Sequence, residues 1–352
     1  MPTIALTNVF SDNIQSFKQL GQRLASPQWV ENTFGATIER QYRENSWFTP
    51  EFCRYALSAI SKMLASGALE AYYARYKDTA PDVAPRKRVA VISAGNIPLA
   101  AFHDFFCILV SGNDYQGKLS SQDQYLLPVL AEELTRIAPE FGDRISFVEK
   151  IADFDAVIAT GSNNSARYFD YYFSKFPHIL RKNRNSVAVL NGHETEEELR
   201  LLADDIYLYF GLGCRSVSKI FVPKGYDFVP FLQILTQESQ PIALHHQFNN
   251  NLEYQKAVHL MNQIYYMDAG TFLLVENQNY ASPIGMLYYE YYEDIENVNR
   301  RLTEDADQLQ CIVSHDPHIT LAAPFGSAQT PTPSDYPDGI DTLQFLWDTT
   351  TL

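Results

Sequence analysis

The chain reads Phe210-Gly211-Leu212-Gly213-Cys214-Arg215-Ser216-Val217-Ser218-Lys219-Ile220-Phe221-Val222 at the point that decides its organisation. A thiol follows a glycine-rich bend and precedes a short apolar run that predicts a β-strand. Glycine adopts positive φ angles and lets a ligand come close to the backbone. A thiolate is nucleophilic where it is accessible and has hydrogen-bond donors nearby, and such a bend supplies both. Taken alone, the motif favours a buried structural cysteine.

Composition limits the classes of protein to which the chain can belong. At 352 residues it is long for one hydrophobic core, so two packed domains are expected. Its hydrophobic content of 46% and charged content of 20% are those of a globular protein, not a disordered one. The net charge of −15 argues against nucleic acid or an anionic membrane as the main partner.

The sequence also indicates where the protein works. The first residues lack a basic segment followed by an apolar one, so no secretory signal is expected. No apolar run approaches the roughly 18 residues that a membrane helix needs. The four cysteines, Cys53, Cys107, Cys214 and Cys311, lie far apart, without zinc-site or disulfide spacing. A reducing cytoplasm and no metal site are the expectations.

Apolar runs alternate with helical patterns over the middle of the chain. Helices are expected over 16–24, 50–64 and 66–76, followed by a linker at 78–88. Strands are expected at 89–94, 156–160 and 186–190, each with a turn at its carboxyl end. This alternation predicts a doubly wound parallel α/β sheet of Rossmann type. The expected domains are 1–192, with N-terminal helices and a cofactor-binding sheet, and 193–346, an α/β catalytic domain with the cysteine; 347–352 is a tail.

Three turns at strand ends are candidate ligand sites, since ligands of open α/β sheets bind there. Asn96 could donate to an oxyanion, or could simply cap its turn. The turn at Gly161 and Ser162 precedes a helix whose amides could hold a phosphate, but a plain loop fits as well because the full G-x-G-x-x-G pattern is missing. Lys118 follows a strand-like segment and could meet a ribose or phosphate, or be solvated.

The order of these motifs carries a family resemblance. Gly95-Asn96-Ile97-Pro98-Leu99, Lys118-Leu119-Ser120-Ser121, Gly161-Ser162, Leu190-Asn191-Gly192 and Gly211-Leu212-Gly213-Cys214 each adjoin a strand. This succession resembles the aldehyde dehydrogenase superfamily, and within it the fatty acyl-CoA reductases of bacterial luminescence (LuxC type). The resemblance extends from Val89 to Leu346 and includes Pro324-Phe325-Gly326-Ser327-Ala328-Gln329.

The resemblance implies a role for each matching residue. Cys214 is the expected nucleophile, which takes the acyl group as a thioester. Asn96 and the Cys214 amide are the expected oxyanion donors. The expected cofactor-binding residues are Lys118, Ser120, Ser121, Gly161, Ser162, Asn191 and Gly192. His193 and Glu194 are candidates for a displaced acid/base pair, with a helix-capping role as the alternative for Glu194.

Two departures from the superfamily pattern bear on the reaction. Hydrolytic aldehyde dehydrogenases carry a glutamate in a Glu-Leu-Gly-Gly motif, whereas the matching stretch here, 188–192, has no carboxylate. The thioester is therefore expected to survive and accept hydride. NAD-preferring members often carry a glutamate three residues after the lysine, and Ser121 stands there instead. This makes NADPH permissible, with NADH as the alternative.

The resemblance thus implies reduction of an acyl-CoA, or another acyl thioester, to an aldehyde with NADPH. A CoA-acylating or other aldehyde dehydrogenase and a non-catalytic acyl-carrying or scaffold protein are the alternatives. A homo-oligomer and an acyl-supplying partner protein are further expectations. The basic clusters 86–88 and 181–184 precede strands and are interpreted as solvated surface. The aromatic groups at 168–173 and 288–292 would suit a long acyl chain, but core packing accounts for most such residues.

Overall fold

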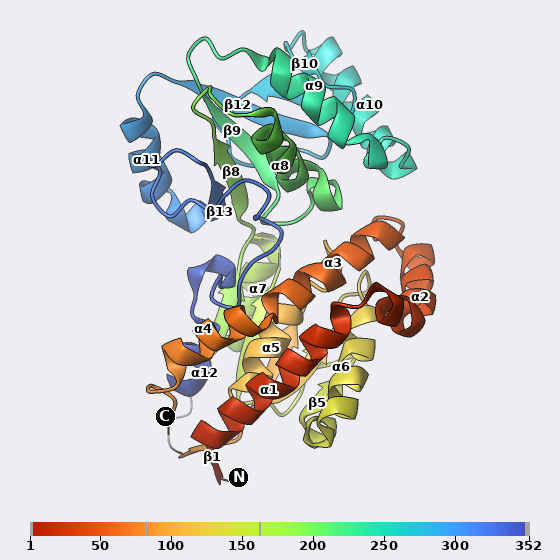
Figure 1. The fold of residues 1–352 in the computed structure, drawn as a ribbon, viewed down its shortest axis with the longest axis vertical. Helices are drawn as coiled ribbons and strands as arrows, with labels where there is room; N and C mark the ends of the chain where they lie inside the picture. The colour runs from red at the N-terminus through yellow and green to blue at the C-terminus, as the bar shows by residue number, and fades with distance from the viewer. Residues whose placement is uncertain (1–2, 82, 162, 349–352) are drawn as a thin grey trace. The chain divides into compact units, whose positions relative to one another are not determined.

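The computed structural model describes residues 3–81, 83–161 and 163–348 and divides the chain into two compact units (Figure 1). Unit 1 comprises the residues up to Asn183 and those from Thr330 onward, and unit 2 comprises Arg184–Gln329. Each unit has its own largely parallel sheet. The predicted doubly wound α/β class is confirmed, because both sheets are largely parallel and alternate with helices.

Unit 1 begins with four helices: α1 (Leu6–Leu24), α2 (Pro27–Glu44), α3 (Pro50–Met63) and α4 (Ser66–Tyr76). The sequence predicted a helical region over residues 1–80 and located parts of α1, α3 and α4 within it, but it gave no bounds for α2. The start of α2 is nevertheless encoded locally, because the Ser26 side chain accepts from the Trp29 amide and Pro27 is the first helical residue. Its buried face is narrow and includes Val30, Phe34 and Ile38, which explains the weak signal.

The main sheet of unit 1 consists of five parallel strands. Their order is β5 (Ile145–Phe147), β4 (Asp114–Lys118), β3 (Arg88–Ile92), β6 (Ala156–Thr160) and β7 (His178–Arg181). The short strands β1 (Thr3–Ala5) and β2 (Val83–Pro85) form a separate antiparallel pair. Because Ile92 pairs with Lys118, the loops that follow β3 and β4 leave the sheet side by side.

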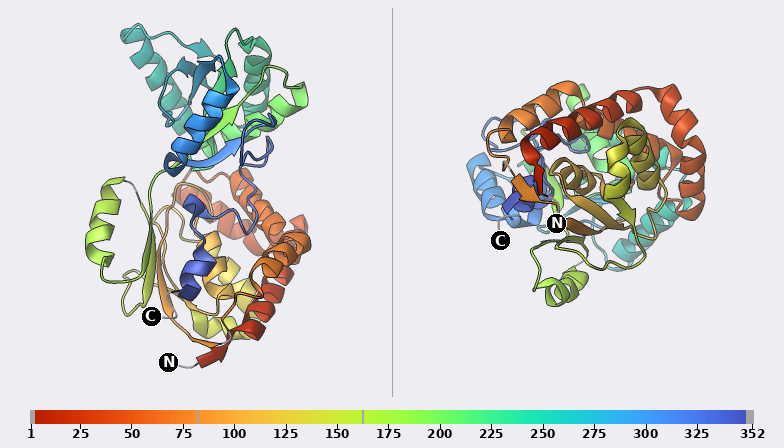
Figure 2. Two further views of the ribbon diagram at one scale, coloured as in Figure 1. Left: turned by 90° about the vertical axis from the view of Figure 1, so that its left-hand side faces the viewer. Right: turned by 90° about the horizontal axis from the view of Figure 1, so that it is seen from below.

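Helices cover both faces of this sheet, as the left-hand view of Figure 2 shows. One side holds α5 (Phe102–Val110), α6 (Leu126–Ile137), the 3-10 turn η1 (Pro139–Arg144) and, outside them, α1. The other side holds α7 (Asn163–Phe173), whose Phe173 packs against Ala90 and Val157. The expected burial of the aromatic stripe in α7 is wrong for Tyr168, Tyr171 and Tyr172, which are exposed.

Unit 2 contains a six-stranded sheet. The strand order is β10 (Met267–Asp268), β11 (Leu273–Glu276), β12 (Met286–Tyr292), β9 (Val217–Pro223), β8 (Asn185–Val189) and β13 (Leu309–Val313), and only β10 is antiparallel. Its helices are α8 (Glu196–Tyr207), α9 (Phe228–Glu238), α10 (His246–Met261) and α11 (Ile295–Glu304), with 3-10 turns η2 (Leu208–Gly211), η3 (Gln240–Ile242) and η4 (Ala306–Gln308).

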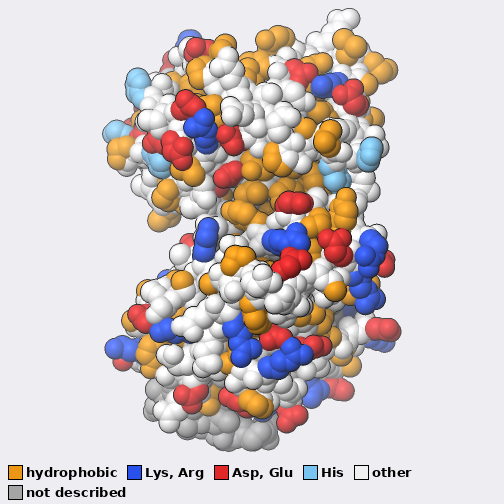
Figure 3. Space-filling model, turned by 45° about the vertical axis from the view of Figure 1, so that its right-hand side comes forward, with side chains coloured by type: hydrophobic (Ala, Val, Ile, Leu, Met, Phe, Trp, Pro, Cys, Tyr) orange, Lys and Arg blue, Asp and Glu red, His pale blue; other side chains and the backbone are white. Residues whose placement is uncertain are grey.

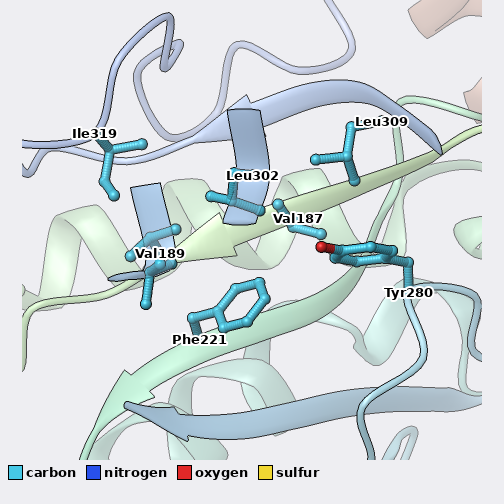
Figure 4. Packing of buried hydrophobic residues seen from close by; sticks show 8 residues of the cluster. Val187, Val189, Phe221, Tyr280, Leu302, Leu309 and Ile319 are labelled. Atoms are coloured by element: carbon cyan, nitrogen blue, oxygen red, sulfur yellow. The ribbon is translucent and has the colours of Figure 1, made fainter. Parts of the chain in front are cut away.

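A compact hydrophobic cluster fixes α11 on this sheet (Figure 4). Val187 and Val189 of β8 and Phe221 of β9 pack with Leu302 of α11 and Leu309 of β13. Side chains of this size each contribute about 1.5–3 kcal/mol on complete burial. The cluster aligns β8 with β9 and so determines where the loops at their ends emerge.

The unit boundary differs from the expected one at residue 192. It lies between Asn183 and Arg184, because β8 pairs with β9 and β13 and therefore belongs to the second sheet. The chain also returns to unit 1 at Thr330 and continues through η5 (Pro337–Gly339) into α12 (Thr342–Asp348). Trp347 of α12 is buried, although a tail was expected from that residue.

A buried ion pair holds this returning segment. Arg181 of β7 pairs with Asp104 of α5 and donates to the Thr342 hydroxyl at 3.1 Å. Arg181 is 5% exposed, so the interpretation of the 181–184 cluster as solvated surface is wrong for this residue. Elsewhere, acidic and basic side chains are interspersed on the face shown in Figure 3.

We expect Arg181→Leu to lower the free energy of unfolding by about 3–5 kcal/mol, because it leaves the Asp104 carboxylate buried without its cation. The double variant Asp104→Leu/Arg181→Leu should lose much less, since neither charge then remains. Urea denaturation followed by circular dichroism measures both. Equal losses in the single and double variants would contradict this account.

Candidate active site

Cys214 lies in the turn that leads into β9 and is exposed. Its backbone is tied to the sheet, because the Ser186 hydroxyl of β8 donates to the Cys214 carbonyl at 2.9 Å. Ser186 also pairs with Val217 in the parallel ladder between β8 and β9. The thiol is therefore presented at the amino edge of the unit 2 sheet from a fixed backbone, and the reading of Cys214 as a buried structural cysteine is wrong.

The bend before Cys214 is more strained than the sequence suggested. Gly211 has the expected positive φ of 73°, but Tyr209 and Phe210 are also left-handed, with φ of 55° and 58°. Non-glycine residues in this region cost of the order of 1–3 kcal/mol each and persist only where packing over-determines them. Here the Phe210 ring is buried 4.4 Å from His245 and 5.7 Å from Phe248, between ring centroids.

The segment that follows β13 supports the same turn. The Asp205 carboxylate accepts from the amides of Gly326 and Ala328 at 2.7 and 3.0 Å, and Gln329 then donates to the Ser216 hydroxyl at 3.0 Å. Burial raises the pKa of Asp205 to about 7, although both amide bonds lower it. The residues 324–329 are thereby attached to α8 and to the residues just after Cys214.

The other cysteines are less suited to nucleophilic chemistry. Cys53 and Cys107 are fully buried, as the sequence predicted, and Cys311 is partly buried. Burial raises the pKa of Cys53 to about 12 and the pKa of Cys107 well above its ordinary value. Ionising either thiol inside the core is therefore unfavourable, whereas Cys214 meets water.

Unit 1 contains a pocket of about 620 Å³ at the carboxyl ends of β3, β4 and β5. Its lining includes Lys118, Ser120 and Ser121, three of the predicted cofactor-binding residues, together with Ser93 and Glu149. The strand ends explain why these groups converge, since β3 pairs with β4 and β4 with β5 in parallel register. This is the edge at which ligands of doubly wound sheets bind.

The polar groups of this pocket fit the ribose or a phosphate of a nicotinamide nucleotide. Lys118 offers a cation and Ser120 and Ser121 offer hydroxyls, which suit hydroxyl and phosphate oxygens. A Cβ on Gly95 would lie 2.2 Å from the Ser120 hydroxyl oxygen, so only glycine allows this loop approach. Glu149 brings a carboxylate into the same pocket from the β5 side, which the sequence analysis missed.

The predicted oxyanion donor Asn96 and the cofactor candidate Gly161 lie on neighbouring turns of unit 1. Asn96 is exposed in the turn after β3, and Gly161 follows β6, where its amide donates to the Arg181 carbonyl at 3.3 Å. Ser162 lies outside the described residues. Asn96 and Gly161 thus stand at the ends of adjacent strands of one sheet, as expected.

Four predicted residues lie away from Cys214. Asn191, Gly192, His193 and Glu194 follow the carboxyl end of β8, whereas Cys214 precedes the amino end of β9. The two strands are parallel, so these positions are at opposite edges of the sheet. The structure therefore does not bring Glu194 or His193 to Cys214. The stretch 188–192, which was matched to the Glu-Leu-Gly-Gly motif, leads to the edge of the sheet opposite Cys214.

Glu194 instead stabilises its own turn. Its carboxylate accepts from the Asn191 and Gly192 amides at 2.6 and 3.2 Å, while burial raises its pKa. The helix itself starts with a capping box formed by Thr195 and Glu198. The turn-stabilising alternative for Glu194 is therefore the one that the contacts support.

Comparison with known proteins agrees with this fold. Residues 67–238 match the family model described as acyl-CoA reductase (LuxC), a segment that contains Asn96, Lys118 and Cys214. The predicted family resemblance is confirmed. Among curated proteins, none matches the sequence significantly.

Solved aldehyde dehydrogenases share the fold at low identity. Aldehyde dehydrogenase 21 from Physcomitrella patens, in complex with succinate, has a TM-score of 0.67 at 11% identity, covering 98% of this chain and 87% of its own. An indole-3-acetaldehyde dehydrogenase complexed with NAD+ has a TM-score of 0.58 at 14% identity, covering 90% and 74%. An E. coli NADP-dependent enzyme has the same TM-score at 13% identity, covering 89% and 74%.

The family match and the fold together support oxidoreductase chemistry on an aldehyde or acyl group. Among the described helices, none is both long and apolar enough to cross a membrane. In the same part of the chain, no group of three or more histidine, cysteine or acidic side chains is placed to hold a metal ion.

We expect iodoacetamide at pH 8 to alkylate Cys214 before Cys311 and to leave Cys53 and Cys107 unmodified until the protein is unfolded, because burial raises the pKa values of those two thiols. Peptide mass spectrometry at timed intervals measures each site. Labelling of Cys107 in the native protein at the rate of Cys214 would contradict the assignment.

We expect Lys118→Gln to weaken binding of ADP-ribose about tenfold to a hundredfold, since a hydrogen bond from a charged group contributes about 1.5–3 kcal/mol. Isothermal titration calorimetry measures the dissociation constant. Lys150→Gln is the matched control, because Lys150 is exposed near the pocket but is not among its lining residues. An equal loss in both variants would indicate a non-specific charge effect.

Proposed function

We propose that the protein reduces an acyl thioester, specifically an acyl-CoA, to the corresponding aldehyde through an acyl-enzyme on Cys214. The observation that carries this proposal is the exposed thiol of Cys214. Its backbone is held by the Ser186 hydrogen bond, and it lies within the segment that matches the acyl-CoA reductase family. An exposed thiolate can act as the nucleophile that accepts an acyl group from a thioester.

The first half-reaction is acyl transfer. The Cys214 thiolate attacks the thioester carbonyl carbon, and Asn96 and the Cys214 amide stabilise the negative oxygen that forms. The bond from this carbon to the sulfur of CoA then breaks, and the CoA thiolate leaves. The strained bend and the Ser186 hydrogen bond keep the backbone of Cys214 fixed while its side chain reacts.

The second half-reaction releases the aldehyde. When bound, a reduced nicotinamide nucleotide would supply the hydride that the acyl carbon needs. The resulting thiohemiacetal on Cys214 breaks its carbon–sulfur bond, so that the aldehyde leaves and the thiolate is regenerated. Lys118, Ser120 and Ser121 are the residues we propose to hold the nucleotide.

We propose NADPH as the donor, because Ser121 leaves no carboxylate three residues after Lys118 to repel a 2′-phosphate. Glu149 favours the second candidate, NADH, since its carboxylate lines the same pocket and can accept from ribose hydroxyls. Comparing the affinities of 2′,5′-ADP and 5′-ADP for the wild-type protein and Glu149→Gln separates the two. A gain for 2′,5′-ADP alone in the variant identifies Glu149 as the discriminating group.

We expect incubation with a series of acyl-CoAs to add one acyl mass to the peptide containing Cys214, and NADPH to remove it with release of aldehyde. Cys214→Ser should lower turnover by several orders of magnitude, because the nucleophile is lost. Cys311→Ser is the matched control and should retain activity. A Cys214→Ala variant that still consumes NADPH with acyl-CoA would overturn the proposal.

Aldehyde, CoA and NADP converted to acyl-CoA, with no reaction in the opposite direction, would instead identify a CoA-acylating dehydrogenase. Acylation of Cys214 without reduction would identify an acyl-carrying protein. Intact-protein mass spectrometry and absorbance of the reduced nucleotide distinguish these outcomes in one set of samples.

A further inference from the structure

Two loops at the carboxyl edge of the unit 1 sheet are joined at three points. The first follows β3 and carries Asn96, and the second follows β4 and carries the cofactor-binding serines. The Ser93 amide donates to the Lys118 carbonyl at 3.1 Å. Gly95 approaches Ser120 so closely that a Cβ would collide with its side chain. The third point is a hydrogen bond between Leu99 and Asp123.

Leu99 holds an unusual backbone conformation at the end of the Asn96 turn. Its φ is 61°, in the left-handed region, and its side chain is buried. A bulky residue in this region persists only where its surroundings enforce it. The enforcing contact is the Leu99 amide, which donates to the Asp123 carboxylate at 2.8 Å.

Asp123 is fixed within the loop that follows β4, which we call the nucleotide-binding loop. Its own amide donates to the Ser120 carbonyl at 3.0 Å. The carbonyl of the preceding Gln122 accepts from the Gln41 side chain at 2.8 Å and from the Asn45 side chain at 3.3 Å, which anchors the loop to the end of α2. Movement of this loop would therefore be transmitted to Leu99.

Burying the Asp123 carboxylate costs more folding free energy than burying a neutral group that accepts the same hydrogen bond. Asp123 is 5% exposed, and its second oxygen is buried with no hydrogen-bond partner among the described residues. Burial raises the pKa of Asp123 to about 7. A buried carboxylate that costs folding free energy and also holds a strained turn is typical of a functional position.

We propose that Asp123 is a positioning residue that holds the Asn96 turn in register with the nucleotide-binding loop, so that nucleotide binding and acylation of Cys214 are coupled. The inference rests on the proposed function, in which Asn96 stabilises the oxyanion. Asp123 itself touches neither substrate nor thiol in this scheme. It acts through Leu99 on one side and Ser120 on the other.

The main test measures acylation of Cys214 by acyl-CoA, using rapid quench and intact-protein mass spectrometry, with and without 2′,5′-ADP. Asp123→Ala should slow acylation about tenfold to a hundredfold, within the range for loss of one oxyanion donor. The dissociation constant for 2′,5′-ADP should change less than about threefold, because Lys118 and both serines remain. In wild type, 2′,5′-ADP should change the acylation rate, and in Asp123→Ala this change should disappear.

Two further variants separate positioning from general damage. Asp123→Asn retains an oxygen that can accept from the Leu99 amide, so it should recover most of the rate. Asn96→Ala should slow acylation by itself, and adding Asp123→Ala to it should cost little more, because both act through the same donor. Additive losses in the double variant, or an unchanged rate in Asp123→Ala, would overturn the proposal.

Hydrogen–deuterium exchange gives a readout that does not depend on the reaction. Residues 93–101 should exchange faster in Asp123→Ala than in wild type, and 2′,5′-ADP should slow their exchange in wild type only. If Asp123→Ala does not fold, Asp123→Ser, which is too short to reach Leu99, takes its place. Wild-type protein that never acylates would refute the proposed function, whereas unchanged exchange at 93–101 would refute the positioning role alone.

Discussion

The parallel pairing of neighbouring strands is the constraint on which the Cys214 turn of unit 2 and the pocket of unit 1 both depend. In unit 2, β8 and β9 pair in parallel with Ser186 opposite Val217, so Ser186 can reach the Cys214 carbonyl and fix the turn that bears the thiol. In unit 1, the pairing of Ile92 with Lys118 brings the loops after β3 and β4 together. In each case a backbone ladder sets which loops meet, and side chains then supply the chemistry.

The structure uses strain and burial where precise placement is needed. Three successive left-handed residues precede Cys214, and a buried aromatic group holds them. A single left-handed leucine closes the Asn96 turn, and a buried carboxylate holds it. Both features cost folding free energy, which the hydrophobic cores of the two units offset.

Several residues near the site could be predicted and others could not. The glycine bend, Cys214 and the pocket residues Lys118, Ser120 and Ser121 follow from short motifs next to predicted strands. His193 and Glu194 were placed by their distance along the chain, which does not reveal the edge of the sheet at which a loop lies. Glu149 and Asp123 had no motif, because their relevance arises from strands and turns that are distant in sequence.

The sequence by itself determined the succession of strands and helices, the family resemblance and the identity of the thiol, since periodicity and local motifs are properties of consecutive residues. The tertiary structure alone decided that β8 belongs to the second sheet and that Arg181 is buried against Asp104. It also decided that Cys214 and Glu194 stand at opposite edges. Strand order, register and burial depend on contacts between distant residues, and no local pattern encodes them.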